Sequence, residues 1–358
     1  MLSEFIRSEL EELRRASLVR EPRVIDRIRG PFVTIDGREL VSFCSNDYLG
    51  IGQDPRLAEA AGRAAREHGW GAASSRALLG TTRWHVELEA AIAEFKGAPA
   101  ALHFPSGYAA NLGLLATIAD RETLIVSDEL NHASLIDGCR LSRAKVEVYP
   151  HRNAEAAKKL LLQEAPRKFV LTDTVFSMEG DLAPLDDLRR LGSDVVIDDV
   201  HGLGVFGPDG RGNLDVPIQT GNLAKAAGGS GGFVVGSRDL IDLLRSRARA
   251  FLFTTAPPPA ACAAGIEALR LIRSGSERRE KLWKNIRLLG AQSPIHTKIL
   301  GSNERALEAS GKLFELGFFV PAIRPPTVAP GTARLRITVT AMHEREQIEA
   351  LLEALRKV

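Results

Sequence analysis

The chain has 358 residues, of which 44% are hydrophobic and 26% charged, and its formal net charge is +2. This length suffices for about two domains, and the composition is that of an ordinary globular protein. A charge so close to neutrality gives no electrostatic reason to expect a protein that binds nucleic acid or a membrane surface.

Cysteine spacing and apolar run length limit the protein class further. Cys44, Cys139 and Cys262 are far apart and form no CxxC pair, which argues against a zinc site and a disulfide framework. The opening residues, MLSEFIRSELEELRR, mix charged and apolar side chains at helical period, unlike a signal peptide. No apolar run approaches the ~18 residues of a membrane span. We therefore expect a cytoplasmic protein without membrane contact.

The first two thirds of the chain predict an α/β domain. A helix is expected near residues 3–17, then an extended segment from Phe32 to Phe43 with a turn at Asp36-Gly37. Short apolar runs then alternate with stretches long enough for crossover helices. Five runs are apolar on both faces, as buried parallel strands are; they are residues 123–128, 145–149, 168–173, 194–199 and 231–236. This alternation predicts a central, mostly parallel sheet.

The pattern changes at the three consecutive prolines within residues 250–261, which indicate a domain boundary. The remaining residues predict a long helix, two or three strands and two further helices, which together make a small α+β domain. We predict three parts: residues 1–44, a helix and extended segment that packs with the small domain; residues 45–255, a large domain; and residues 256–358, the small domain.

One motif in the large domain is misleading. Residues 202–207, GLGVFG, follow a predicted strand and match the GxGxxG pattern of dinucleotide-binding proteins. That pattern requires a helix directly afterwards, whose N-terminus holds the pyrophosphate. Pro208, Gly210 and Gly212 follow here, and they disfavour a helix. We predict a loop and no dinucleotide site.

Acidic residues and histidines gather after three predicted strands, in residues 128–132, 173–177 and 198–201. Ligands of open α/β sheets bind outside the carboxyl ends of the strands. Any one of these residues alone is better explained as a helix cap or a core hydrogen-bond partner. Their repetition after three strands favours a common functional site.

Two further segments add a phosphate cradle and a special lysine. Ser106 and Gly107 open a predicted helix, where a capping hydroxyl and free backbone N–H groups suit an anion, although such pairs are common. Lys225 lies among alanines and glycines, which predicts an enclosed amine of lowered pKa, suited to imine formation. The alternative is a solvent-facing lysine in a flexible glycine turn. Together with an aspartate on a buried strand, these features fit pyridoxal phosphate, whose ring nitrogen needs a carboxylate partner.

At this point the chain resembles the α-oxoamine synthases, pyridoxal-phosphate enzymes of fold type I, the aspartate aminotransferase fold. The resemblance covers nearly the whole chain. Besides the Lys225 segment, the matching stretches are SNDYLG (45–50), SRALLGTTRWHVELE (75–89), FPSGYAAN (104–111), DELNHASLIDG (128–138), VFSMEGD (175–181), DDVHGLGVFGPDGRG (198–212), AIRPPTV (322–328) and RLRITVTAMH (334–343). Residues 322–328 favour the branch that makes 8-amino-7-oxononanoate for biotin.

The resemblance implies four catalytic residues. Lys225 would form the Schiff base with the cofactor and move protons at the substrate Cα. Asp198 would pair with the pyridine nitrogen, His201 with the ring hydroxyl, and His132 would stack on the ring.

It also implies further cofactor contacts. Ser106, Gly107 and Tyr108 would hold the phosphate, helped by Thr254 or Thr255 from the partner subunit of a homodimer. Ser177 would lie near the ring hydroxyl. Asn222 stands where the family usually has threonine, and we expect weaker or altered phosphate anchoring there. Two other departures, Thr82 in place of a common histidine and TVAPG at residues 327–331, concern loops.

On the substrate side, the resemblance implies that Arg336 grips the amino-acid carboxylate. Arg20 and Thr327 would line the acyl side. Arg324 either joins them or forms a supporting salt bridge, and the two alternatives are evenly weighted.

The implied reaction is the decarboxylative condensation of L-alanine with a pimeloyl thioester, carried by coenzyme A or acyl carrier protein. Two alternatives stay open. Another α-oxoamine synthase, such as a glycine acetyltransferase, would share the catalytic residues and differ in the acyl pocket. A protein that kept the fold as a non-catalytic binding module would not need Lys225, Asp198, His132 and His201 intact.

Overall fold

The computed structural model describes all 358 residues, which divide into two compact units. The smaller unit comprises Met1–Asn46, Met178–Gly180 and Glu280–Val358, and the larger comprises Asp47–Ser177 and Asp181–Arg279. The larger unit thus extends beyond the predicted boundary at residue 255. The reason is that helix α10 (Pro259–Ser274) packs on α2 (Pro55–His68) and α3 (Arg83–Lys96), which belong to that unit.

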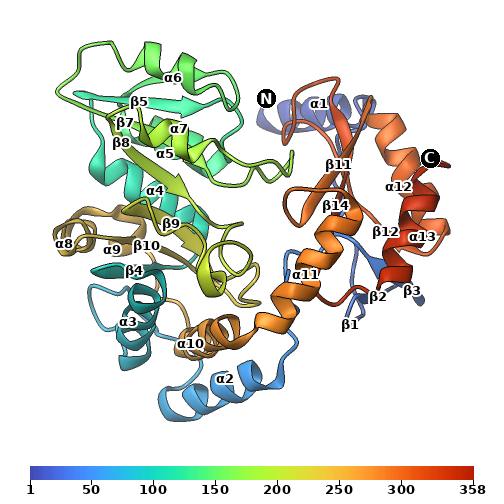
Figure 1. The fold of residues 1–358 in the computed structure, drawn as a ribbon, viewed down its shortest axis with the longest axis horizontal. Coiled ribbons are helices and arrows are strands. Elements are labelled where there is room, and N and C mark those ends of the chain that lie inside the picture. The colour runs from blue at the N-terminus through green and yellow to red at the C-terminus, as the bar shows by residue number, and fades with distance from the viewer. The chain divides into compact units, whose positions relative to one another are not determined.

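The larger unit is built on a seven-stranded sheet in the order β4-β10-β9-β8-β7-β5-β6 (Figure 1). Its strands are β4 (Ala100–Phe104), β5 (Thr123–Asp128), β6 (Lys145–Tyr149), β7 (Arg167–Asp173), β8 (Asp194–Asp198), β9 (Ile218–Asn222) and β10 (Gly232–Gly236). The contiguous strands from β9 to β6 are parallel, whereas β10 runs antiparallel to both β4 and β9. The predicted α/β fold with a mostly parallel sheet is confirmed.

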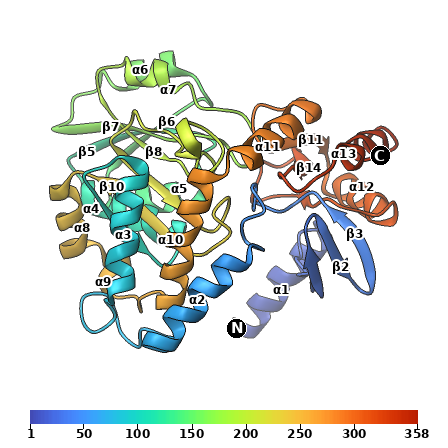
Figure 2. The same cartoon turned by 60° about the horizontal axis from the view of Figure 1, so that its bottom comes forward.

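Helices cover both faces of this sheet (Figure 2). The helices are α4 (Gly107–Ile118), α5 (Ala133–Ser142), α8 (Arg238–Arg247) and α9 (Arg249–Leu252) against one face, and α6 (Ala154–Leu160) and α7 (Leu185–Arg189) against the other. Ile125 belongs to the first core and its neighbours Leu124 and Val126 to the second. Because both faces are buried, the strand sequences are continuously apolar, which is the signal that predicted them.

Residues 202–207 form turns and no α-helix follows them, as predicted. Gly204 and Gly207 have φ angles of +80° and +70°, and only a 3-10 turn at Pro208–Gly210 comes next. Strands β4 and β9 were not predicted. Strand β9 contains Gln219 and Thr220, and such polar side chains hide a buried strand from a hydrophobic pattern.

The smaller unit contains two sheets, in the orders β1-β2-β3-β12 and β11-β14-β13. Their strands are β1 (Arg27–Arg29), β2 (Phe32–Ile35), β3 (Arg38–Ser42), β12 (Phe318–Phe319), β11 (Ile295–Gly301), β14 (Ala333–Thr338) and β13 (Ala322–Ile323). The helices are α1 (Leu2–Arg15), α12 (Asn303–Glu315), α13 (Arg345–Leu355) and α11 (Ser276–Leu289), which contains the division between the units. Strand β12 pairs with β3, so the N-terminal segment and the C-terminal residues share a sheet. None of the helices combines the length and apolar composition that crossing a bilayer requires.

Candidate active site

The four residues predicted to be catalytic come together at one edge of the seven-stranded sheet. Asp198 ends β8 and His201 follows it, His132 lies beyond the end of β5, and Lys225 lies in the turn after β9. These strands are parallel, so their carboxyl ends meet at the same edge, where ligands of such sheets bind.

Lys225 and His201 are in direct contact. The Lys225 Nζ lies 2.6 Å from His201 Nε2, and His201 Nδ1 lies 2.6 Å from the hydroxyl oxygen of Tyr48. Both His201 and Tyr48 are buried, while Lys225 is half-buried, between the enclosed and exposed alternatives considered above. A neutral imidazole donates from one nitrogen and accepts at the other, so the His201 ring links the Tyr48 hydroxyl to the Lys225 amine.

Asp198 is buried and its carboxylate is oriented by two donors. The side-chain amide of Asn111 on α4 donates to Oδ2 at 2.7 Å, and the backbone N–H of Val200 donates to Oδ1 at 3.0 Å. Asn111 also donates to the Ser134 hydroxyl and accepts from that of Thr220. The carboxylate is therefore fixed through one amide to α4, α5 and β9.

The ring of His132 is neutral and partly open to solvent. Its Nδ1 accepts from the backbone N–H and hydroxyl group of Ser134, which assigns the ring proton to Nε2. Loss of surrounding water, opposed by the Asp198 carboxylate, lowers the pKa of His132. Its backbone N–H donates to Asp173, a carboxyl group whose pKa burial and the nearby Asp198 raise. An uncharged, exposed ring is suited to stacking on a flat ligand.

The N-terminus of α4 forms an anion cradle. The Ser106 hydroxyl caps the helix by accepting from the backbone N–H of Ala109 at 3.0 Å. A Cβ on Gly107 would lie 3.0 Å from the Asn222 amide nitrogen, and one on Gly232 would lie 2.5 Å from the Gly107 nitrogen. Glycine at these positions lets the start of β10 and the Asn222 side chain approach the first turn of α4 closely. The first N–H groups of α4, which have no acceptor within the helix, and the adjacent Asn222 amide are donors that suit a phosphate group.

The other residues predicted to contact the cofactor are Tyr108, Ser177, Thr254 and Thr255. Tyr108 donates its hydroxyl hydrogen to Asp137, a contact that raises the pKa of Tyr108 and lowers that of Asp137. Ser177 is half-buried in a turn after the bridge between Val175 and Leu182. The hydroxyl groups of Thr254 and Thr255 have no hydrogen-bond partner in the chain, although Thr255 pairs through its backbone with Ser75. Their contact with a partner subunit stays a prediction.

The four predicted substrate residues all belong to the smaller unit. Arg336 is buried on β14, where it donates to the Thr338 hydroxyl at 3.0 Å and to the Asn46 amide oxygen at 3.2 Å. The other three lie together. Arg20 donates to the carbonyl oxygens of Arg324 and Pro325, and the Thr327 N–H also donates to the Arg324 carbonyl.

Arg324 itself is buried, and its side chain donates to the Ser17 carbonyl oxygen. Its Nε has no hydrogen-bond partner, and no carboxylate forms an ion pair with it, so the supporting salt bridge considered above is absent. Burial and the charge of Arg20 lower the pKa of Arg324.

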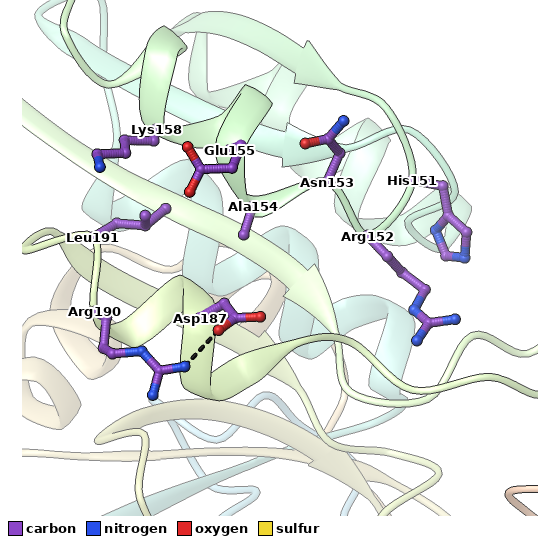
Figure 3. A pocket seen from close by; sticks show the side chains of 9 residues that line it. All are labelled: His151, Arg152, Asn153, Ala154, Glu155, Lys158, Asp187, Arg190 and Leu191. Atoms are coloured by element: carbon purple, nitrogen blue, oxygen red, sulfur yellow. Dashed lines mark hydrogen bonds and ion pairs between the residues drawn. The ribbon is translucent and has the colours of Figure 1, made fainter.

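A separate polar cavity of about 610 Å³ contains none of the predicted site residues (Figure 3). It is lined by His151, Arg152, Asn153, Ala154, Glu155, Lys158, Asp187, Arg190 and Leu191. Both arginines that line it form ion pairs, Arg190 with Asp187, which also lines the cavity, and Arg152 with the neighbouring Asp181. His151 bridges Asp128 and Asp181 at 3.0 Å each; burial opposes its charge, but the two carboxylates raise its pKa to about 9. We assign this cavity a structural role.

Comparison with known proteins agrees with this geometry. Residues 38–355 match the family model of class I and II aminotransferases. The chain belongs to this family. It is 46% identical to the 8-amino-7-oxononanoate synthase of Methylococcus capsulatus, over 97% of the chain and 96% of that protein.

Two solved structures extend the comparison. The serine palmitoyltransferase from S. paucimobilis, with a bound adduct of pyridoxal phosphate and myriocin, is 31% identical and superposes with a TM-score of 0.92, over 100% of this chain and 98% of that one. The 8-amino-7-oxononanoate synthase from Francisella tularensis is 28% identical with a TM-score of 0.79, over 89% and 97%. The predicted resemblance and fold type are confirmed.

Tyr48 and Asn111 were not assigned roles from the sequence, although both lie in stretches that carry the resemblance, 45–50 and 104–111. The signal that identifies them is chemical. A buried tyrosine hydroxyl and a buried amide in an apolar helix each need a hydrogen-bond partner, and here the partners are His201 and Asp198.

The Tyr48 contact predicts a stability difference between two tyrosines that are equally buried. Tyr48→Phe removes the hydrogen bond between the Tyr48 hydroxyl and His201 Nδ1 in the interior, which should cost about 1–3 kcal/mol of unfolding free energy. Tyr149→Phe removes a hydroxyl that contacts the Thr172 side chain without a well-formed hydrogen bond, and it should cost less. Chemical denaturation of the two variants measures both effects, and equal losses would refute the role given to the Tyr48 hydroxyl.

The His151 bridge predicts a pH-dependent stability. The pKa of His151 rises from 6.5 to about 9 on folding, so the bridge stabilises the protein fully below pH 6.5 and loses its effect as pH rises through 9. Unfolding free energies between pH 5.5 and 10 should therefore show His151→Gln less stable than the wild type by on the order of 2–3 kcal/mol at low pH, converging at high pH. His68→Gln, at an exposed position on α2, serves as the control with a flat difference. A His151→Gln deficit that is constant across this range would contradict the bridge.

Proposed function

We propose that the chain is a pyridoxal-phosphate-dependent acyltransferase. It condenses L-alanine with a pimeloyl thioester and releases 8-amino-7-oxononanoate, carbon dioxide and the free thiol, a step of biotin synthesis. The observation that carries the proposal is the contact of the Lys225 amine with His201, on the turn that also holds the buried Asp198 carboxylate. The 46% identity to an 8-amino-7-oxononanoate synthase supports the choice of reaction.

The residues of the larger unit would hold the cofactor at both ends. Lys225 would carry it covalently, Asp198 would accept a hydrogen bond from its ring nitrogen, and His132 would cover the ring face. The N-terminus of α4 and Asn222 would bind the phosphate, with Ser106, Gly107 and Tyr108 around it and Ser177 near the ring hydroxyl. When bound, pyridoxal phosphate supplies a cationic ring that accepts the electron pair released at the amino-acid Cα.

The chain's own part in the chemistry is proton movement at Lys225. The His201 contact at 2.6 Å restrains the amine, and Tyr48 restrains His201 in turn. Once the amino group of alanine has displaced it from the cofactor, the restrained amine would remove the proton from the substrate Cα and return a proton there after carbon dioxide has left. Such general acid–base catalysis by a positioned group contributes roughly 10²–10⁴-fold to the rate. Asp198, held by Asn111 and Val200, would keep a proton on the ring nitrogen of the bound cofactor.

The arginines of the smaller unit would select the substrates. Arg336 would pair with the alanine carboxylate. Arg324 is buried with no carboxylate partner and lies beside the exposed Arg20, so an anionic ligand would relieve the repulsion between them. The distal carboxylate of a pimeloyl chain is such an anion, and Thr327 lies on the same segment. Either coenzyme A or acyl carrier protein can carry this chain, and the proposal covers both.

A glycine acetyltransferase is the alternative within the family. It would use the same lysine, aspartate and histidines, but an acetyl group has no distal charge to meet Arg20 and Arg324. The unpaired Arg324 therefore favours the pimeloyl substrate. The three free cysteines are in keeping with action in the cytoplasm.

We also propose that the active form is a homodimer. Large apolar side chains are exposed on the segments joined by the bridge between Ser75 and Thr255. Trp70, Leu78, Leu79 and Phe253 are 75%, 81%, 78% and 71% exposed. Apolar groups of this size gathered on the surface mark a protein interface. In the dimer, the unpartnered hydroxyl groups of Thr254 or Thr255 would reach the partner's phosphate.

The dimer proposal predicts that Leu79→Glu weakens self-association and cofactor binding together. A charge introduced into an apolar interface remains unpaired when the interface is buried. Sedimentation velocity measures the first effect and titration with pyridoxal phosphate the second. Leu162→Glu, at a position that is 79% exposed after α6, is the matched control and should change neither. A monomeric Leu79→Glu variant with full activity would refute the proposal.

The proposed reaction is tested by comparing substrate pairs. Pimeloyl thioester with L-alanine should give a kcat/KM higher by orders of magnitude than acetyl thioester with glycine, because only the first acyl group can pair with Arg324. One methyl group in an apolar pocket contributes only about 1–3 kcal/mol, so glycine should replace alanine poorly but measurably. Borohydride reduction followed by peptide mapping should locate the cofactor on Lys225, and Lys225→Ala should form no product. If the acetyl and glycine pair were the better substrates, the acetyltransferase alternative would replace this proposal.

A further inference from the structure

A buried ion pair involves the residue that directly follows the end of β8. Asp199 follows Asp198, and its Oδ2 lies 2.8 Å from the Nζ of Lys96, the last residue of α3. The side chains are only 3% and 1% exposed. Nothing in the proposed chemistry uses either residue, so the presence of two fully buried charges here needs a reason.

Every hydrogen-bonding group of this pair is occupied. The Lys96 ammonium donates to Asp199 and to the carbonyl oxygens of Arg211 and Asn213, at 2.8 Å and 3.0 Å. The Asp199 carboxylate also accepts from the Thr174 hydroxyl at 2.9 Å and from the Asn213 backbone N–H at 2.8 Å. The pair thus joins the end of α3, the segment after β7 and the loop at residues 211–213.

The same aspartate sets the turn that carries His201. The N–H groups of Gly202 and Leu203 donate to the Asp199 carbonyl oxygen, and the Asp199 N–H donates to the Thr220 carbonyl oxygen on β9, the strand before Lys225. A Cβ on Gly202 would lie 2.0 Å from the Asp199 carboxylate, so the turn is wrapped closely around this side chain. A shift of the carboxylate therefore shifts His201 relative to Lys225.

The loop at residues 211–213 is also packed closely against the Asp199 carboxylate. Gly212 has a φ of +74°, and a Cβ there would lie 2.1 Å from the other carboxylate oxygen of Asp199. Thr174, the third partner, donates its backbone N–H to the Asp198 carbonyl oxygen at 2.9 Å. The hydrogen bonds of Asp199 and its partners therefore hold both adjoining parts of the chain: Asp198, which precedes Asp199, and the turn with His201, which follows it.

We propose that Lys96 and Asp199 are positioning residues that fix Asp198 and His201 relative to Lys225. A buried ion pair contributes little net stability, because desolvation offsets the attraction. Its retention at this place is explained by geometry: it sets the turn to which the Lys225 amine is bonded. This inference rests on the proposed function, since it assigns the pair to the cofactor site.

The test compares variants of the cofactor-loaded protein. Lys96→Met leaves the buried Asp199 carboxylate unpaired, and Lys96→Met combined with Asp199→Asn removes both charges. Three quantities are measured: the pH at which the bound cofactor changes its absorbance, the dissociation constant for pyridoxal phosphate, and the melting temperature. Steady-state kinetics with L-alanine and pimeloyl thioester then separate kcat from KM.

A positioning role has a specific signature. The single variant should melt lower, release the cofactor more readily and shift the absorbance transition. In the double variant the melting temperature should recover, because no charge is left unpaired, while the shifted transition and a kcat reduced by up to about 10²-fold should remain. The KM for the thioester should stay close to the wild-type value in both variants.

The chain supplies a matched control on the same helix. Glu89 of α3 forms a second buried ion pair with Arg76, at 2.9 Å and with side chains 7% and 5% exposed, and its carboxylate accepts from the His103 N–H and from no residue of the turn after β8. Glu89→Gln should lower the melting temperature without moving the absorbance transition. The positioning role is overturned if Glu89→Gln shifts the transition as much as Lys96→Met does, or if the double variant regains both stability and wild-type kcat.

These outcomes are distinguishable from failure of the proposed function. A wild-type protein that binds pyridoxal phosphate but makes no product from alanine and pimeloyl thioester refutes the reaction, while the absorbance and affinity measurements still decide the role of the pair. A wild-type protein that does not bind the cofactor refutes both.

Discussion

The site depends on how one buried carboxylate is compensated. An ionised aspartate without partners in the interior is strongly unfavourable, and Asp198 avoids this by accepting from Asn111 and Val200. Because Asn111 also bonds Thr220 and Ser134, the same amide ties β8 to α4, β9 and α5. The N-terminus of α4, which forms the anion cradle, is therefore held at a fixed separation from the carboxylate. A rigid ligand with a phosphate at one end and a ring nitrogen at the other requires such a fixed separation.

The parts of the fold that were predicted depend on local signals. Strands β5, β7 and β8 are largely apolar on both faces because helices cover both, and the Ser106 cap is readable from its own segment, whereas the edge strand β6 is mostly exposed. The parts that were missed depend on remote partners. Strand β9 is polar in sequence, and its Thr220 is satisfied by Asn111, more than a hundred residues earlier. Tyr48 meets His201 across a similar separation, so no local pattern reveals its role.

Consecutive prolines can indicate either a domain boundary or the start of a helix. Pro257 to Pro259 suggested a domain boundary, yet Pro259 begins α10, a position where its missing N–H costs no hydrogen bond. The unit changes only at Glu280, inside the continuous helix α11, where no break in composition marks it. Likewise, cavity volume alone does not identify the site. In the 610 Å³ cavity Arg190 pairs with Asp187, whereas the buried Arg324 has an Nε without a hydrogen-bond partner.

Asn222 shows how the two ends of the site are coupled. Its Oδ1 accepts from the Ala224 N–H at 2.7 Å and so shapes the turn that carries Lys225, while its amide nitrogen faces Gly107 in the cradle. The threonine usual at this position has a single oxygen, whereas asparagine separates acceptor and donor on two atoms. With asparagine here, the oxygen holds the turn, and the amide nitrogen would be left to bind the phosphate, which is how we expect the anchoring to be altered. Lys225 is then positioned from two sides, through Asn222 by its own turn and through His201 by the turn that Asp199 holds. The first support is a hydrogen bond from the backbone to the Asn222 side chain, and the second ends in the contact between the side chains of His201 and Lys225.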